Sequence, residues 1–264
     1  MMKKQIERIG RNGYYNYLGL RDFLLFTRDV LSTLFNFYSQ VQIGFSVIVK
    51  QVYFTGYEAK WLIIFVALAI GGVLILQGNI YLTAFGQTRM IYLLLVTVVV
   101  RELSSLLTAM IVIARSGTSI STELGNMVVN KEIDLLRSFG ISPLSYLVVS
   151  RTAGVIAAMF ILTIVFNVTA VLGGWFFSTL FYPLNIEVFI SNFMAEITVS
   201  DIILSVIKSI VYGFSIALIS SYHGLKVVKA STEVPQRTIK AVVYSITTVV
   251  IANGIITFVY YWLK

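Results

Sequence analysis

Four long stretches of this chain contain no Asp, Glu, Lys or Arg, and this constrains the fold more than any other feature of the sequence. The charge-free stretches are residues 61–88, 152–186, 209–225 and 241–263. About eighteen or more predominantly apolar residues are long enough to cross a bilayer as a helix. Only 12% of the 264 residues are charged, about half the share in a soluble domain. We therefore predict an all-α, multi-pass membrane protein.

Five spans are predicted, and the basic residues predict their orientation. The spans are placed at 61–80, 91–114, 150–180, 202–221 and 241–262. Of twenty Lys and Arg residues, sixteen fall in the N-terminal region through Lys60, in 115–151 or in 222–240. The opposite side has Arg89 and Lys264 alone. Because basic residues mark cytoplasmic loops, the N-terminus is predicted inside and the C-terminus outside. This bias explains the net charge of +8 better than nucleic-acid binding does.

Residues 1–50 are predicted to form an N-terminal region distinct from the transmembrane domain at 51–264. Within this region, the segment from Arg21 to Gln42 has two faces when it is turned as a helix. The apolar side carries Phe23, Phe26, Val30, Leu31, Leu34, Phe35, Phe37 and Tyr38. An amphipathic helix lying at the membrane surface is the favoured interpretation. The alternative is a helix whose apolar face packs on the protein's own core.

Three ionisable residues fall inside predicted spans. Arg101 and Glu102 are adjacent in the second span, and Lys208 lies in the fourth. A charge near the middle of a bilayer costs about 2.5–3.5 kcal/mol on insertion scales, so such residues usually face a cavity or one another. Arg101 and Glu102 lie about 100° apart on an α-helix, so both can point toward one interior. The residues predict a polar pocket, with a structural ion pair between helices as the alternative.

The longest predicted cytoplasmic loop, 115–151, contains a short helix. Asn130 is a candidate N-cap, Glu132 suits the first turn and Arg137 suits the last, while Gly140 and Pro143 end the helix. The apolar residues of this helix are Ile133, Leu135, Leu136 and Phe139. They could pack on the protein itself or dock into a groove on a cytoplasmic partner.

Several motifs, in a consistent order from about residue 45 to 260, resemble those of the MlaE/YrbE permeases. They include Lys50-Gln51-Val52-Tyr53-Phe54-Thr55-Gly56, Arg101-Glu102-Leu103, Glu123-Leu124-Gly125, Ile133-Asp134, Ile207-Lys208-Ser209 and Tyr222-His223-Gly224. Permeases of this family are the membrane subunits of ABC-type lipid transporters that work with MCE-domain proteins. The resemblance implies a homodimer in the bacterial inner membrane that moves phospholipid. It also implies an ATPase partner, an MCE partner and, in some systems, a small STAS-type regulator.

The resemblance assigns roles to particular residues. Arg101, Glu102 and Lys208 match positions that line the lipid cavity, where cations suit a phosphate and apolar walls suit the tails. The segment 115–145 matches the part that couples to the ATPase. Its candidate coupling residues are Glu123, Lys131, Glu132, Asp134, Leu136 and Arg137.

Other functions are disfavoured by what the sequence lacks. It has no G-x-x-x-x-G-K-[ST] phosphate loop, so ATP and magnesium are expected on a separate subunit. There is no cysteine, and one histidine, His223, makes no metal cluster, so we expect neither a metal site nor an enzyme. Two alternatives stay open. One is a secondary transporter that uses Arg101, Glu102 and Lys208 for ion coupling, and the other is a structural membrane anchor for an MCE assembly.

Overall fold

The computed structural model describes residues 2–35, 41–83, 89–181, 185–228 and 230–263, and every regular element within them is a helix. Five of these helical stretches are long and apolar enough to cross a membrane, which confirms the predicted number of spans. They are Ser46–Tyr81, Arg89–Val129, Leu144–Leu180, Val199–Leu225 and Glu233–Trp262. Each is longer than its predicted span because helix continues past the apolar run at one or both ends.

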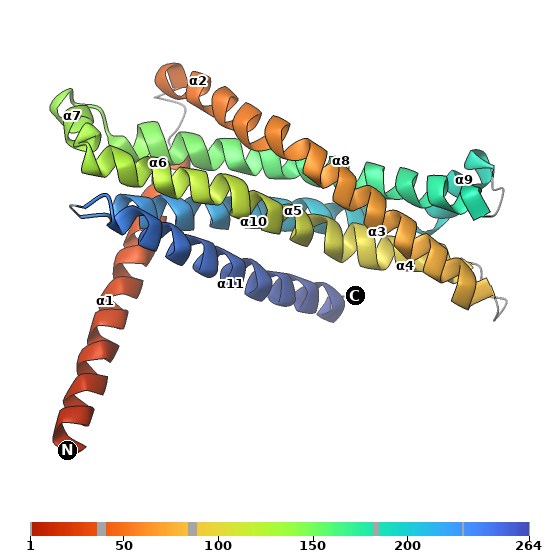
Figure 1. Ribbon diagram of the computed structural model, residues 1–264, viewed down its shortest axis with the longest axis horizontal. Coiled ribbons are helices and arrows are strands. Elements are labelled where there is room, and N and C mark those ends of the chain that lie inside the picture. Colours follow the sequence, from red (N-terminus) through yellow and green to blue (C-terminus); the bar gives the residue numbers. More distant parts are fainter. Residues whose placement is uncertain (1, 36–40, 84–88, 182–184, 229, 264) are drawn as a thin grey trace.

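The spans lie side by side along the long axis of the molecule (Figure 1). Helix α3 (Glu58–Thr83) packs along α8 (Ser150–Phe181), and α10 (Val199–Leu225) packs against both α8 and α11 (Glu233–Trp262). Two short helices, α7 (Glu132–Ser138) and α9 (Ile186–Glu196), lie at opposite ends of this bundle. The predicted cytoplasmic end is the one that carries α7.

The second span is one continuous helix with two π-helical segments. It comprises α4 (Arg89–Leu94), η3 (Leu95–Leu103), α5 (Ser104–Val112), η4 (Ile113–Gly117) and α6 (Thr118–Val129). The sequence prediction ended this span at 114 and read the small polar residues that follow as loop. Instead they form the α6 surface that packs on α10 and α11.

Helix α1 (Met2–Phe35) projects from the bundle and packs on it through its C-terminal part (Figure 1). Val30 is fully buried against Val148, Val149 and Leu218, and three further apolar residues pack around this cluster. These are Phe23, Phe26 and Leu34. These four members of the predicted apolar face thus pack on the protein's own core, as the alternative interpretation held, whereas Leu31 of the same predicted face is exposed. Predicted members of that face at 35, 37 and 38 have no described side chains.

A second apolar stripe of α1 stays exposed. It consists of Leu20, Leu24, Leu25 and Leu31. On the packed side of α1, Tyr222 of α10 holds the helix through two contacts. Its hydroxyl donates to the carbonyl of Gly19 over 3.2 Å, and its ring packs edge to face on Phe23. Lys226 adds an ion pair with Asp22 at 3.6 Å. The exposed stripe is the part of α1 that can enter the membrane surface.

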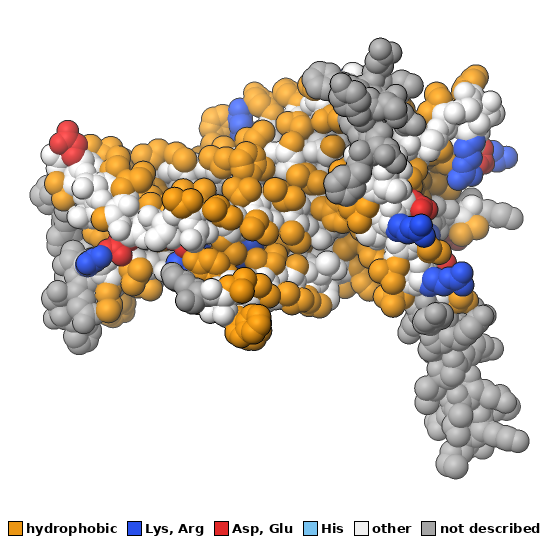
Figure 2. All heavy atoms as spheres, turned by 180° about the vertical axis from the view of Figure 1, so that it is seen from behind, with side chains coloured by type: hydrophobic (Ala, Val, Ile, Leu, Met, Phe, Trp, Pro, Cys, Tyr) orange, Lys and Arg blue, Asp and Glu red, His pale blue; other side chains and the backbone are white. Residues whose placement is uncertain are grey.

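The outer surface of the bundle suits a hydrocarbon environment. Hydrophobic side chains cover most of the flank seen in Figure 2, and the visible acidic side chains lie toward its two ends. Exposed apolar residues occur along every span, including Phe65, Val168, Ile207 and Phe258. Together with the length of the helices, this distribution matches a protein immersed in a bilayer.

Candidate functional site

Two ion pairs join the second span to the fourth in the interior of the bundle. The Arg101 guanidinium Nη2 lies 2.7 Å from Oδ1 of Asp201, and Nζ of Lys208 lies 2.7 Å from Oε2 of Glu102. Arg101 and Glu102 belong to η3, whereas Asp201 and Lys208 belong to α10, one face of which carries both. The structure therefore brings together the three residues that the sequence singled out and adds a fourth charge.

Helix α11 completes this cluster with hydroxyl groups. Lys208 donates to Oγ1 of Thr257 over 2.9 Å, and the Thr257 hydroxyl donates to Oε1 of Glu102 over 3.0 Å. Arg101 Nη1 donates to the Tyr261 hydroxyl over 2.8 Å. Residues from three spans thus form one hydrogen-bonded network, which we call the charge cluster: Arg101, Glu102, Asp201, Lys208, Thr257 and Tyr261.

The four charges of the cluster differ in their access to the surroundings. The exposed fractions of the side chains are 0% for Lys208, 1% for Asp201 and 9% for Arg101, but 27% for Glu102. Both cations are therefore sealed, and so is one carboxylate. The formal charges sum to zero, which makes burial tolerable in a low-dielectric interior. Glu102 is the charged group that an approaching molecule meets first.

Asp201 is the functional candidate that sequence reasoning missed. It sits at the third position of α10 and forms a capping box, because its Oδ2 accepts from the backbone nitrogen and the hydroxyl of Thr198. That local role accounts for an aspartate near a helix start without any ion pair. The sequence feature that could have identified Asp201 is its position seven residues before Lys208, which places both side chains on one face of a helix.

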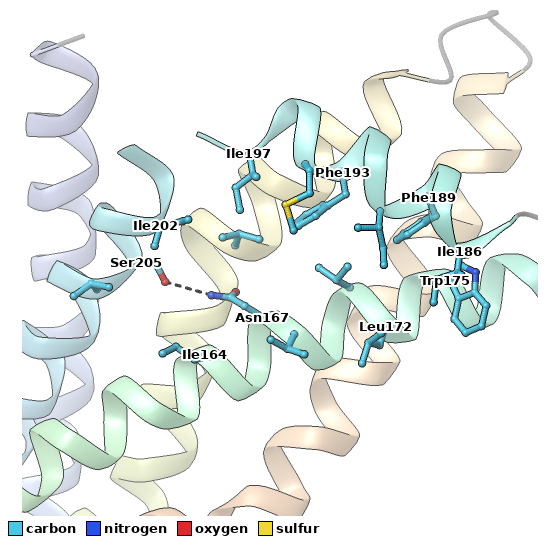
Figure 3. A pocket seen from close by; sticks show the side chains of 16 residues that line it. Ile164, Asn167, Leu172, Trp175, Ile186, Phe189, Phe193, Ile197, Ile202 and Ser205 are labelled. Atoms are coloured by element: carbon cyan, nitrogen blue, oxygen red, sulfur yellow. Dashed lines mark hydrogen bonds between the residues drawn. The ribbon is translucent and has the colours of Figure 1, made fainter. Parts of the chain in front are cut away.

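An apolar cavity of about 360 Å³ lies between α8, α9 and α10 (Figure 3). Two residues that line it, Val100 and Ile202, are the sequence neighbours of Arg101 and Asp201 in the charge cluster. Its wall includes Leu172, Phe189 and Phe193, and Val100 of η3 also lines it. One polar pair interrupts this lining: Nδ2 of Asn167 donates to Oγ of Ser205 over 3.5 Å. A volume near 360 Å³ is at the lower end of small-molecule pockets, and this lining suits hydrocarbon.

The segment predicted to couple to an ATPase forms the α7 end of the bundle. Glu123 on α6 forms an ion pair with Nη2 of Arg151 at 2.6 Å, and Arg115 pairs with Glu58. Asn130 was the predicted N-cap of the short helix, but Lys131 occupies that position with a left-handed φ of 60°. Asn130 instead ends α6, because that helix extends further than predicted.

Two apolar residues of the short helix α7 pack on the protein, and two are exposed. Ile133 is buried, and Leu136 packs beside it against the core. Leu135 and Phe139 are 56% and 71% exposed. The charged coupling candidates lie on the outside: Glu132 accepts from Asn130 over 3.2 Å, and Asp134 pairs with Arg137 at 3.4 Å. Packing on the protein itself is confirmed for Ile133 and Leu136, whereas docking of Leu135 and Phe139 on a cytoplasmic partner stays a prediction.

Comparison with known proteins decides the family. A family model described as "Permease MlaE" matches residues 48–259, which is most of the chain. The chain belongs to the MlaE permease family. The match covers nearly all of the five spans and includes η3, α10 and most of α11, and Tyr261 is the one member of the charge cluster that lies beyond it.

Relatives of this MlaE-family permease carry names that agree with the assignment. A "Probable ABC transporter permease protein" of Rickettsia typhi is 30% identical over 80% of this chain and 82% of its own length. The "Intermembrane phospholipid transport system permease protein MlaE" of Haemophilus influenzae is 24% identical over 92% of each chain. The chloroplastic protein "TRIGALACTOSYLDIACYLGLYCEROL 1" of Arabidopsis thaliana is 29% identical over 66% of this chain and 50% of its own. This MlaE-family permease is a multi-pass protein of the bacterial inner membrane.

Proposed function

We propose that this permease moves phospholipid as the membrane subunit of an ABC transporter. The observation that carries the proposal is the charge cluster, a neutral polar network inside an otherwise apolar bundle with a hydrocarbon-lined cavity beside it. A molecule with a charged head and apolar tails suits such surroundings. Support also comes from the Haemophilus influenzae relative, whose name specifies phospholipid transport.

The proposed assembly contains two copies of the permease, with the lipid path between them, and a separate ATPase that supplies the energy. An MCE-domain protein would accept or deliver lipid at the α9 end, and a small STAS-type protein would regulate the ATPase. At that end Glu187 lies in the first turn of α9, whereas Glu196 pairs with Arg89. Of the two carboxylates, Glu187 is the better placed to contact an external partner.

ATP-dependent lipid transfer tests this function directly. The permease and its ATPase are placed together in proteoliposomes with a fluorescent phospholipid, and transfer to the MCE protein is followed with ATP or without it. We expect transfer only when ATP, the permease and the ATPase are all present. Transfer driven by a proton gradient without the ATPase would instead identify a secondary transporter. An intact assembly that moves no lipid under any condition would identify a structural anchor.

The exposed apolar side of α7 is the proposed docking surface for the ATPase. Leu135 and Phe139 project from a short helix whose other side is fixed by Ile133 and Leu136, so a partner would meet a preformed apolar ridge. Buried apolar anchors of this kind dominate the energy of many interfaces. The double variant Leu135→Glu/Phe139→Glu is expected to reduce co-purification of the ATPase about tenfold or more.

Val228→Glu is the matched control for this double variant. Val228 is also exposed and apolar, and it follows α10 in the connection to α11 rather than on α7. Its substitution should leave ATPase recovery unchanged. All variants should show the same helical content by circular dichroism, because the substituted side chains are not buried. Equal ATPase recovery in the double variant and the wild type would exclude this ridge as the docking surface.

A further inference from the structure

The accessible charge of the cluster is negative, which has a consequence for the headgroup that this site can bind. Glu102 is 27% exposed, whereas the side chains of Arg101 and Lys208 are 9% and 0% exposed. A lipid phosphate that approached this site would therefore meet a carboxylate before it met either cation. Two negative groups repel each other strongly where little water screens them.

Lys208 also has no donor left for a phosphate. An ammonium group has three N–H donors. The described acceptors are also three: Oε2 of Glu102 at 2.7 Å, Oγ1 of Thr257 at 2.9 Å and the carbonyl oxygen of Arg101 at 3.1 Å. A phosphate could bind Lys208 only by displacing one of these partners inside a sealed site.

Arg101 is also poorly placed to bind a headgroup, because its side chain is 9% exposed and both of its terminal nitrogens already have partners. Its Nη2 contacts Asp201 and its Nη1 donates to the hydroxyl of Tyr261. Its Nε has no hydrogen-bond partner among the described residues, but that atom is buried and so cannot reach a headgroup outside. Both cations of the cluster are therefore less accessible to an incoming phosphate than the Glu102 carboxylate is.

Glu102, in contrast, keeps spare capacity to accept hydrogen bonds. An ionised carboxylate offers about four acceptor positions on its two oxygens. Lys208 donates to Oε2, and the Thr257 hydroxyl is 3.0 Å from Oε1 and 3.2 Å from Oε2. At least one acceptor position remains on a group that is partly exposed. A cationic donor is the natural ligand for it.

We infer that Glu102 binds the ammonium group of a zwitterionic lipid headgroup, such as that of phosphatidylethanolamine, and so selects against lipids whose headgroup carries only a phosphate charge. This inference rests on the proposed function and names the headgroup class for the same site. Lys208 and Thr257 act as positioning residues, because they donate to the Glu102 carboxylate and hold it in its place. Asp201 pairs with Arg101 and does not contact that carboxylate.

Competition between two lipids tests the inference. The purified permease is incubated in detergent with equal amounts of phosphatidylethanolamine and phosphatidylglycerol that have identical chains, and native mass spectrometry measures which lipid stays bound. Wild type should retain phosphatidylethanolamine over phosphatidylglycerol about tenfold, the ratio expected for one charge-assisted hydrogen bond. Glu102→Gln should abolish the preference, because it removes the accessible anion while Lys208 stays buried.

Two further variants show whether the headgroup preference depends on the exposure of the carboxylate or on the net charge of the cluster. Asp201→Asn removes a carboxylate that is 1% exposed, so the preference for phosphatidylethanolamine should persist. The double variant Glu102→Gln/Lys208→Met keeps the cluster neutral, avoids an unpaired buried cation and should show no headgroup preference. If Glu102→Gln does not fold, the double variant alone decides the question.

The outcomes distinguish this inference from the proposed function. Retention of both lipids by wild type in equal amounts, or a preference for phosphatidylglycerol, overturns the role of Glu102 while lipid binding itself stands. A loss of preference in Asp201→Asn as large as that in Glu102→Gln also overturns it, because the net charge of the cluster rather than the accessibility of the carboxylate would then decide which lipid binds. If wild type retains neither lipid and ATP-dependent transfer is also absent, the proposed function fails together with the inference.

Discussion

The Glu102→Gln variant is expected to lose about 3–5 kcal/mol of unfolding free energy, the largest single effect that we predict for the charge cluster. The substitution keeps the size of the side chain but leaves the Lys208 ammonium without its anion. Because Lys208 is fully buried, water cannot replace the lost interaction. Reversible unfolding in mixed detergent micelles, followed by circular dichroism, measures the change.

The converse substitution, Lys208→Met, should cost less, about 1–3 kcal/mol. It leaves behind Glu102, which is 27% exposed and can recover hydration on its open side. The double variant Glu102→Gln/Lys208→Met should be more stable than Glu102→Gln alone, because replacing both members of a buried pair avoids an uncompensated charge. Equal losses in the two single variants, or losses that simply add in the double variant, would contradict this account.

The sequence predicted three of the four charged residues of the charge cluster but not which cation pairs with which carboxylate. Arg101, Glu102 and Lys208 were expected in the interior because a charge in a span needs a partner or a cavity. Which cation meets which anion depends on how η3 and α10 are aligned, and no local pattern encodes that alignment. The π-helical segment Leu95–Leu103 also changes the angle between successive side chains from the α-helical value on which the prediction relied.

The spans themselves were predictable because an uncharged apolar run has few alternatives to a membrane helix. The extension of the second span through α6 was not predictable, because the serine, threonine and glycine residues of α6 are also typical of loops. In the fold, small residues let neighbouring helices approach. A Cβ on Gly117 would lie 3.1 Å from the Ser220 hydroxyl, and one on Gly125 would lie 3.1 Å from Val234. Close helix packing explains a composition that, without the structure, indicates a turn.

The same principle makes Gly71 a sensitive position. Glycines at 71, 72, 78 and 213 lie at close helix contacts, because a Cβ at each would come within 3.2 Å of an atom on a neighbouring helix. On α3, a Cβ at Gly71 would overlap the carbonyl group of Ala170 on α8, with its carbonyl carbon 2.7 Å away. Backbone atoms cannot rotate aside as a flexible side chain can. Gly71→Ala is therefore expected to force α3 and α8 apart.

We expect Gly71→Ala to lower the unfolding free energy by about 1–3 kcal/mol, the usual cost of overpacking, despite the better helix propensity of alanine. Gly254→Ala is its matched control. Gly254 lies on α11, also within a span, and nothing stands within 4 Å of a Cβ placed there. This control should gain up to about 1 kcal/mol from helix propensity alone. Unfolding in mixed micelles compares the two variants, and a stabilised Gly71→Ala would mean that α3 and α8 do not meet backbone to backbone.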